Sequence, residues 1–320
     1  MLNKENNSPY LNDILENNFE QLQINFPNDY EGKVVSTLVR KLSPKHSTKA
    51  VLYVHGFHDY FFQEELANEF IKHDYNFYAI DLRKSGRSLL NQQIPYNTHS
   101  ISEYYDDIDA ALKQIKAEGN DFIVINAHST GGLTAALYLD KHKDACQALI
   151  LNSPFLEMNK TWAIRKLGIP FIHQFAKIFP ELKIKAGFSP FYGKSINKNY
   201  KGEWDYNLNW KPISISYLTT GWLSAIYKAH KAIKKGLNIT CPILLMSSAK
   251  SIKNKVWIDD FKKADAVLNV EHIRKYAMHL GKNLTAISFE NGLHDLILSE
   301  KSVRTQVYLS MFNWLDKFSI

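Results

Sequence analysis

The sequence contains little cysteine, and its two cysteines, Cys146 and Cys241, lie far apart in the chain. Disulfide-stapled domains and cysteine-rich metal sites need several cysteines at short spacing. Neither is therefore expected, and a reducing compartment fits this composition. HExxH, Walker and dinucleotide-binding glycine motifs are also missing. We expect the protein to use no metal ion and no organic cofactor.

Long hydrophobic runs are missing as well. The longest uncharged stretch, residues 122–139, reads FIVINAHSTGGLTAALYL and includes polar residues and paired glycines. A membrane helix needs about 20 predominantly apolar residues, so this stretch instead predicts a strand, a turn and a helix. The amino terminus, MLNKENNSPYLNDILENN, is polar and acidic, whereas a signal peptide is basic and then apolar. We expect a soluble, cytoplasmic protein.

The charge balance is basic, with 39 Lys and Arg against 32 Asp and Glu, a net charge of +7 and a pI near 9.0. An evenly spread excess would favour a polyanionic partner. Here residues 155–236 hold fourteen basic and four acidic residues, a net charge of +10, which leaves −3 for the rest. Because the charge is local and no nucleic-acid-binding motif is present, no nucleic-acid partner is predicted.

Short apolar runs alternate with helical patterns along most of the chain. The predicted strands are residues 32–42, 49–54, 76–82, 122–127, 148–152, 242–247 and 284–289. The predicted helices lie near residues 61–73, 100–117, 131–142, 269–281 and 300–318. Continuous apolar strands that alternate with helices are typical of a mostly parallel α/β sheet with helices on both faces.

One long stretch interrupts this alternation. Residues 155–236 contain no sheet-like run and hold fifteen aromatic residues. Because so long a loop without structure is uncommon in a compact domain, this stretch is predicted to be an inserted helical cap. The predicted organisation is a core in two parts, residues 1–154 and 237–320, with the cap at residues 155–236 between them.

A candidate nucleophile lies where the strand FIVIN meets the helix GGLTAALYLD. Ser129 stands between Ala127 and Gly131, and such small residues two before and two after a serine permit a strained strand-to-helix turn. The first amides of the helix would then face a developing oxyanion. The pattern favours catalysis by Ser129, with a helix-capping serine as the alternative.

Two further segments carry a resemblance to a known family. HGFHDY at residues 55–60 resembles an oxyanion loop, and DLRKSGRS at residues 81–88 resembles a D-x-R-G-x-G-x-S loop, with Lys84 in place of the usual glycine. With the elbow and the insertion, these segments are similar to α/β-hydrolases of the monoglyceride lipase, lysophospholipase and serine aminopeptidase-like group. The resemblance extends over roughly residues 30–318. It implies an α/β-hydrolase fold and a triad in the order serine, acid, histidine.

The resemblance assigns the base to His294, in NGLHD after the last predicted strand, although a surface histidine is the alternative. Three aspartates follow the strand CPILLMSSA after an apparent insertion. The resemblance favours Asp265 as the acid, because ADAVLNV reproduces the acid, apolar residue and helix start that the resembling enzymes have. Asp259 and Asp260, which stand among several lysines, remain open as alternatives.

The resemblance further implies that the backbone N–H groups of Phe57 and Thr130 form the oxyanion hole. The side chains of Tyr60 and Phe61 are expected to line an acyl pocket, with a place in the core as the alternative. Trp162 is expected to contact substrate from the cap.

Four more side chains near the candidate site have expected roles. His128 is expected to project away from the nucleophile. His55, Arg83 and Arg87 are expected to brace their loops through hydrogen bonds.

The resulting hypothesis is a serine hydrolase of carboxylic esters, of acyl-glycerol or lysophospholipid type, acting through an acyl-enzyme. An amidase, peptidase or acyltransferase could use the same site, and a catalytically silent binding protein could share the fold. The +10 cap disfavours the cationic amino terminus of a peptide substrate. Residues 162–179 resemble a basic amphipathic surface for anionic lipid, with a solvated rim as the alternative. The oligomeric state is not predicted.

Overall fold

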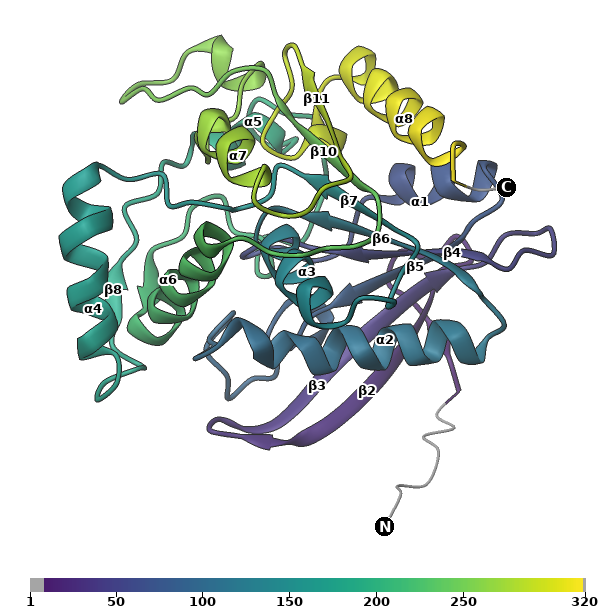
Figure 1. Ribbon diagram of the computed structural model, residues 1–320, viewed down its shortest axis with the longest axis horizontal. Coiled ribbons are helices and arrows are strands. Elements are labelled where there is room, and N and C mark those ends of the chain that lie inside the picture. The colour runs from purple at the N-terminus through teal and green to yellow at the C-terminus, as the bar shows by residue number, and fades with distance from the viewer. Residues whose placement is uncertain (1–8, 319–320) are drawn as a thin grey trace.

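The computed structural model describes residues 9–318, and most of its strands join one twisted sheet (Figure 1). The first eight residues of the polar amino-terminal segment lie outside the described residues. The order across the sheet is β1-β2-β3-β5-β4-β6-β7-β10-β11. Its strands are β1 (Leu11–Asn12), β2 (Glu20–Asp29), β3 (Gly32–Lys41), β4 (Lys49–Val54), β5 (Asn76–Asp81), β6 (Phe122–His128), β7 (Ala148–Asn152), β10 (Ile243–Ser248) and β11 (Leu284–Phe289). From β5 to β11 all pairings are parallel, whereas β1, β2 and β3 pair antiparallel.

Helices cover both faces of the sheet, which explains why its central strands are apolar throughout. Along β4, Val51 and Tyr53 pack on one face, and Ala50, Leu52 and Val54 pack on the other. The first face is covered by α1 (Glu64–Lys72) and α8 (Lys301–Leu315), and the second by α2 (Tyr105–Ala117), α3 (Ser129–Lys141) and α7 (Val270–Ala277). The predicted α/β-hydrolase architecture is confirmed.

The strand β2 was not predicted from the sequence. Its residues, EQLQINFPND, are mostly polar, and only Leu22 is buried. The strand pairs with β3 over most of its length, and the pairing becomes irregular between Phe26 and Asp29, around Pro27, which has no N–H to donate. A near-edge strand of this kind lacks the apolar pattern on which its prediction would depend.

The chain leaves the sheet after β7 and returns at β10. Between them lie a π-helical turn (Ile164–Gly168), α4 (Ile169–Phe175), β8 (Lys183–Lys185), α5 (Phe191–Ile196), β9 (Tyr217–Thr219) and α6 (Thr220–Lys235). The strands β8 and β9 form a separate antiparallel pair, so the insertion is not purely helical. α6 packs on α3, and α4 packs on α6 at the margin of the molecule (Figure 1). We propose that residues 155–236 are the cap and that the described residues before and after them, 9–154 and 237–318, form the core. Among residues 9–318, no helix combines the length and apolar character that a bilayer crossing needs.

Lys84 takes an unusual place in the loop after β5. Its backbone is left-handed, with φ at 61°, a conformation that glycine adopts at little cost. Its fully buried ammonium lies 2.7 Å from Asp29 Oδ2 and 2.5 Å from Glu31 Oε2, and 4.0 Å from the ring centre of Tyr30. These partners belong to the β2–β3 hairpin. The lysine therefore ties the hairpin to the loop where the resembling enzymes have glycine.

Two arginines brace the same loop, as predicted. Arg83 binds the buried Asp107 through its side chain and its backbone N–H. Arg87 joins Asp13 and Asp81 and also donates to a backbone carbonyl. The loop is thus fixed by ion pairs on both sides.

We expect Lys84→Met to lower the free energy of unfolding by about 3–5 kcal/mol, because removing one partner of a buried ion pair leaves its carboxylates uncompensated. Denaturant unfolding monitored by fluorescence measures the change. Lys33→Met, at an exposed position of the same hairpin, is the matched control and should shift the value by less than about 0.5 kcal/mol. A Lys84→Met protein as stable as this control would show that the ion pairs do not hold the hairpin.

Candidate active site

Ser129 lies at the junction of β6 and α3, where the chain turns sharply. Its φ of 51° is strained for a residue with a side chain. The turn also needs the glycine that follows, because a Cβ on Gly131 would lie 2.4 Å from the carbonyl oxygen of His55. The strain and the close packing together form the sharp elbow that the sequence predicts, with Ser129 at the start of a helix.

A hydrogen-bonded chain joins the three predicted triad residues. His294 Nε2 lies 3.0 Å from Ser129 Oγ, and His294 Nδ1 lies 2.9 Å from Asp265 Oδ2. All three side chains are buried. The partners imply that Nδ1 carries the proton and donates a hydrogen bond to the carboxylate. The unprotonated Nε2 then accepts a hydrogen bond from the serine hydroxyl. This arrangement is the one that acyl transfer by a serine nucleophile requires.

The position of Asp265 depends on a loop that leaves β10 and returns to it. Asp265 N donates to Lys250 O at 3.0 Å, and Ile252 N donates to Asp265 O at 2.9 Å, so the excursion between them closes at its base. The Asp265 Oδ1 atom accepts from Val267 N and Leu268 N, both at 2.8 Å, which fixes the carboxylate with Oδ2 toward His294.

The two alternative aspartates lie elsewhere. Asp259 and Asp260 are exposed on the excursion, and their nearest polar partners are Trp257 and Lys250. The structure places Asp265 against His294, and it places neither Asp259 nor Asp260 there.

The loop that carries Phe57 lies directly against the elbow. A Cβ on Gly56 would lie 3.2 Å from Ser129 Cβ, and Thr130 follows the serine in the first turn of α3. Phe57 and Thr130 both line the cavity at Ser129, where their backbone N–H groups are expected to act. His55 braces this loop as predicted, because its Nε2 accepts from Leu82 N at 3.0 Å.

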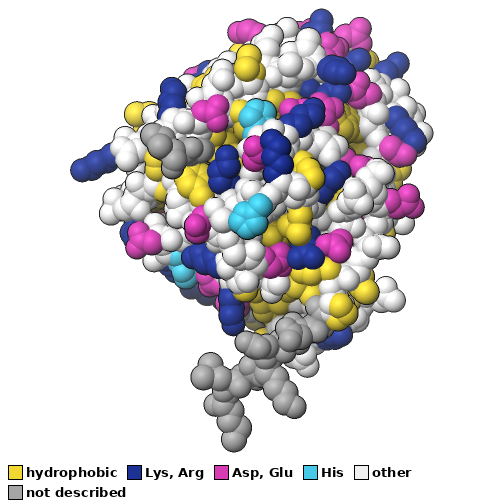
Figure 2. Space-filling view, turned by 90° about the vertical axis from the view of Figure 1, so that its right-hand side faces the viewer, with side chains coloured by type: hydrophobic (Ala, Val, Ile, Leu, Met, Phe, Trp, Pro, Cys, Tyr) yellow, Lys and Arg dark blue, Asp and Glu magenta, His cyan; other side chains and the backbone are white. Residues whose placement is uncertain are grey.

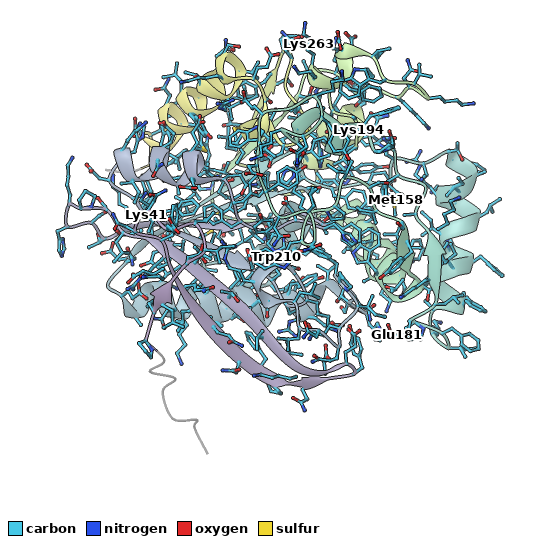
Figure 3. The ribbon with its side chains drawn as sticks, turned by 180° about the vertical axis from the view of Figure 1, so that it is seen from behind. Lys41, Met158, Glu181, Lys194, Trp210 and Lys263 are labelled. Atoms are coloured by element: carbon cyan, nitrogen blue, oxygen red, sulfur yellow. The ribbon has the colours of Figure 1, made fainter. Side chains whose placement is uncertain are left out.

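A cavity of about 300 Å³ opens beside Ser129 and His294. Its apolar lining residues include Phe57, Phe155, Met158, Phe188, Ile213, Ile215 and Trp222. The rings of Phe57 and Trp222 stack at 4.2 Å, and Met158 lies between the sheet and α4 (Figure 3). Among the described lining residues Asp59 is the single acid, against the lysines Lys160, Lys211 and Lys253.

The expected substrate contacts of Tyr60, Phe61 and Trp162 are not found, because none of them lines the cavity. Phe61 is fully buried in the cluster on the α1 and α8 face, and Tyr60 packs in the same cluster. The cavity wall belongs mainly to the opposite face of the sheet. Trp162 is 65% exposed and projects outward beside the π-helical turn. The alternative considered for Tyr60 and Phe61, a place in the core, is correct.

His128 also differs from expectation. Its ring lines the cavity, and its centre lies 4.8 Å from that of His294. Its Nδ1 pairs with the carbonyl oxygen of Asn152 at 3.1 Å, and burial lowers its pKa. His58 lines the cavity too, and burial together with the Lys211 ammonium lowers its pKa to about 3. Both rings are therefore neutral near pH 7.

The sequence did not reveal which cap aromatics face the cavity. A signal was present in α6, where Trp222, Ala225, Ile226, Ala229 and Ile233 are buried at helical spacing. That periodicity gives Trp222 an inward direction. Phe155 and Phe188 lie outside regular helices, and no pattern in the sequence gives their direction.

One group of described side chains has the composition of a metal site: Asp59, His128 and Asp295, whose ligand atoms lie within 4.8 Å of one another. Asp59 already pairs with Lys211 Nζ at 2.7 Å, and Asp295 accepts from Asn152 Nδ2 at 2.7 Å. A cation would have to compete with the lysine ammonium. We therefore assign no metal to this group.

Comparison with known proteins identifies a family for this chain. Residues 45–301 match a family described as serine aminopeptidase, S33. No curated protein has a matching sequence.

Several solved structures share the fold. A soluble variant of monoglyceride lipase from Saccharomyces cerevisiae, in complex with a substrate analogue, is 18% identical at a TM-score of 0.69 and covers 98% of this chain and 100% of that chain. A monoacylglycerol lipase from Paleococcus ferrophilus is 18% identical, with a TM-score of 0.66. The match covers 94% of this chain and 100% of that chain. A carboxyl esterase from Bacillus coagulans is 11% identical, with a TM-score of 0.65. The match covers 94% of this chain and 99% of that chain.

We expect Asp265→Asn to slow covalent labelling of Ser129 by a fluorophosphonate by about 10³–10⁴-fold. The asparagine would present its amide N–H₂ to His294 Nδ1 and so favour the tautomer that cannot accept the serine proton. Labelling rates measured by gel fluorescence test this. Asp260→Asn is the matched control and should label at the wild-type rate; the reverse result would move the acid to Asp260.

Proposed function

Because the chain belongs to the serine aminopeptidase S33 family of α/β-hydrolases, we propose that it is a serine hydrolase that cleaves carboxylic esters of acyl-glycerol or lysophospholipid type. The observation that carries this proposal is the chain of hydrogen bonds from Ser129 through His294 to Asp265, which opens onto a largely apolar cavity. The nucleophile, the base and the acyl-binding wall are thus adjacent.

In the proposed mechanism, Ser129 Oγ attacks the ester carbonyl while His294 Nε2 takes its proton. Asp265 stabilises the imidazolium, and the N–H groups of Phe57 and Thr130 donate to the oxyanion. The tetrahedral intermediate then collapses, and His294 gives its proton to the departing alkoxide. Water, deprotonated by the same histidine, attacks the acyl-serine and releases the carboxylic acid. No residue beyond the triad and two backbone amides has to take part in proton transfer or charge stabilisation.

The lining of the cavity favours an acyl ester over an aminopeptidase substrate. A peptide amino terminus is cationic and needs free carboxylates, whereas Asp59 is paired with Lys211 and three lysines line the cavity. The aromatic and aliphatic wall suits an acyl chain. The monoglyceride lipase and monoacylglycerol lipase among the similar structures support the same substrate class.

A fluorophosphonate should label the wild-type protein and fail to label Ser129→Ala. With p-nitrophenyl esters, kcat/KM should rise about threefold to fourfold per added methylene until the cavity is full, because each buried CH₂ contributes about 0.8 kcal/mol. Aminoacyl p-nitroanilides provide the comparison. Absence of labelling would overturn the hydrolase mechanism, and anilides that react faster than the esters would overturn the ester assignment.

We also propose that the cap rests on anionic lipid. Of nineteen large apolar side chains exposed on the described residues, eight fall between residues 162 and 182: Trp162, Ile164, Leu167, Phe171, Phe175, Ile178, Phe179 and Leu182. Exposed apolar side chains in such a cluster favour an interaction surface. Lys166, Lys177, Lys183 and Lys185 are exposed among them. By contrast, acids and bases intermingle on the face at the other side of the molecule (Figure 2).

Phe171→Glu/Ile178→Glu should lower sedimentation with vesicles of phosphatidylserine and phosphatidylcholine about tenfold or more, because two charges would enter the apolar surface. The matched control is Leu309→Glu, which changes an exposed leucine of α8 and should bind as the wild type does. Equal sedimentation of the wild type with pure phosphatidylcholine would remove the electrostatic part of the proposal. No sedimentation of the wild type would remove the proposal entirely.

A further inference from the structure

The loop at residues 55–60 holds a strained conformation next to Ser129. His58 has a left-handed backbone, with φ at 47°, so the turn persists only where its surroundings hold it. On the core side, His55 fixes the loop because its Nε2 accepts a hydrogen bond from Leu82 N. Phe57, whose N–H is the proposed oxyanion donor, lies between His55 and the strained residue.

On its other side the loop is fixed by contacts with the cap. Asn207 N donates to the Tyr60 hydroxyl at 2.8 Å, and the Trp210 ring meets the Tyr60 ring edge-on at 5.0 Å. The Tyr96 hydroxyl lies within hydrogen-bond distance of the carbonyl oxygens of Asp59 and Trp210. Trp210 lies near the middle of the molecule, away from the projecting α4 (Figure 3). The stretch from Asn207 to Lys211 therefore forms a bracket against the loop.

The ion pair between Lys211 and Asp59 lies at the end of this bracket. Lys211 Nζ is 2.7 Å from Asp59 Oδ1, and their side chains are 8% and 1% exposed. Lys211 is the single buried cation among the fourteen Lys and Arg of residues 155–236, all of which are described. Taking a lysine out of water is costly unless a partner compensates, so this lysine differs from the solvated lysines around it.

The negative charge of Asp59 is stabilised by Lys211 more than by any other group. Its Oδ1 also accepts from Tyr60 N at 3.0 Å, while its buried Oδ2 has no hydrogen-bond partner among the described residues. Burial by itself would raise the pKa of Asp59, but the Lys211 ammonium lowers it, so the carboxylate stays ionised. The charge that fixes the loop is therefore balanced by a residue of the cap.

We propose that Lys211 is a positioning residue, whose ion pair with Asp59 holds the oxyanion loop so that the N–H of Phe57 meets the developing oxyanion. The inference rests on the proposed ester hydrolysis. Lys211 acts through Asp59 and the backbone between Asp59 and Phe57, and it transfers no proton. The cap then contributes to stabilising the transition state as well as to enclosing the substrate.

The test compares Lys211→Met with Asp59→Asn/Lys211→Met on a p-nitrophenyl ester that the wild type hydrolyses and Ser129→Ala does not. We expect kcat to fall about 30-fold in both variants with KM within about threefold, because a displaced oxyanion donor weakens the transition state more than the ground state. The double variant carries no buried unpaired charge and should unfold near the wild-type temperature. A slow but stable double variant separates positioning from a purely structural role.

Chemical rescue provides a second readout. Lys211→Cys treated with 2-bromoethylamine becomes an aminoethyl-cysteine, since the thiolate displaces bromide, and this side chain restores an ammonium at nearly the lysine length. At least half of the lost kcat should return. Wild type treated in the same way controls for Cys146 and Cys241, and Lys201→Met controls for an exposed cap lysine.

Wild-type kcat in the double variant would overturn the inference, and so would a fall in kcat that the rescue does not reverse. Failure of the wild type itself to hydrolyse the ester would overturn the proposed function instead.

Discussion

The parallel pairing of the central strands is the constraint on which the site depends. Parallel pairing brings the carboxyl ends of β6, β10 and β11 to one edge of the sheet, and Ser129, Asp265 and His294 each follow one of these strands. As a result, His294 lies within hydrogen-bond distance of both Ser129 and Asp265, at 3.0 and 2.9 Å. Helices cover both faces of the sheet, so the loops that carry the three proposed triad residues start from rigid strands.

Much of this could be predicted from the sequence, because the informative signals are local. Ser129 lies between an apolar strand and a glycine pair, so it could be located from a few neighbours. His294 follows the last strand, a position that only the family resemblance linked to the base. Asp265 was harder, since the excursion before it hid its distance from β10. Asp265 was preferred for the residues that follow it, and the amides of two of them donate to its carboxylate in the structure.

The cavity could not be predicted in the same way. Tyr60 ends the oxyanion loop and Phe61 follows it, yet the chain passes to the other face of the sheet before they pack. Adjacency in sequence was a poor guide because the loop changes faces within three residues. Trp162 shows the complementary problem: among fifteen cap aromatics, composition does not distinguish the ring that lines a cavity from the ring that faces solvent. Those directions depend on tertiary packing.

The loop that follows β10 is closed by hydrogen bonds where it begins and ends, so it can accept inserted residues. Backbone hydrogen bonds between Asp265 and the residues at Lys250 and Ile252 join the two ends of the loop, while residues 255–260, which do not line the cavity, are mostly exposed. Lengthening a closed loop costs little, about 0.6 kcal/mol for each doubling of its length. The tip of this loop is therefore a place where a peptide tag or even a small domain can be accommodated, in the same loop as the proposed triad acid and without displacing its carboxylate.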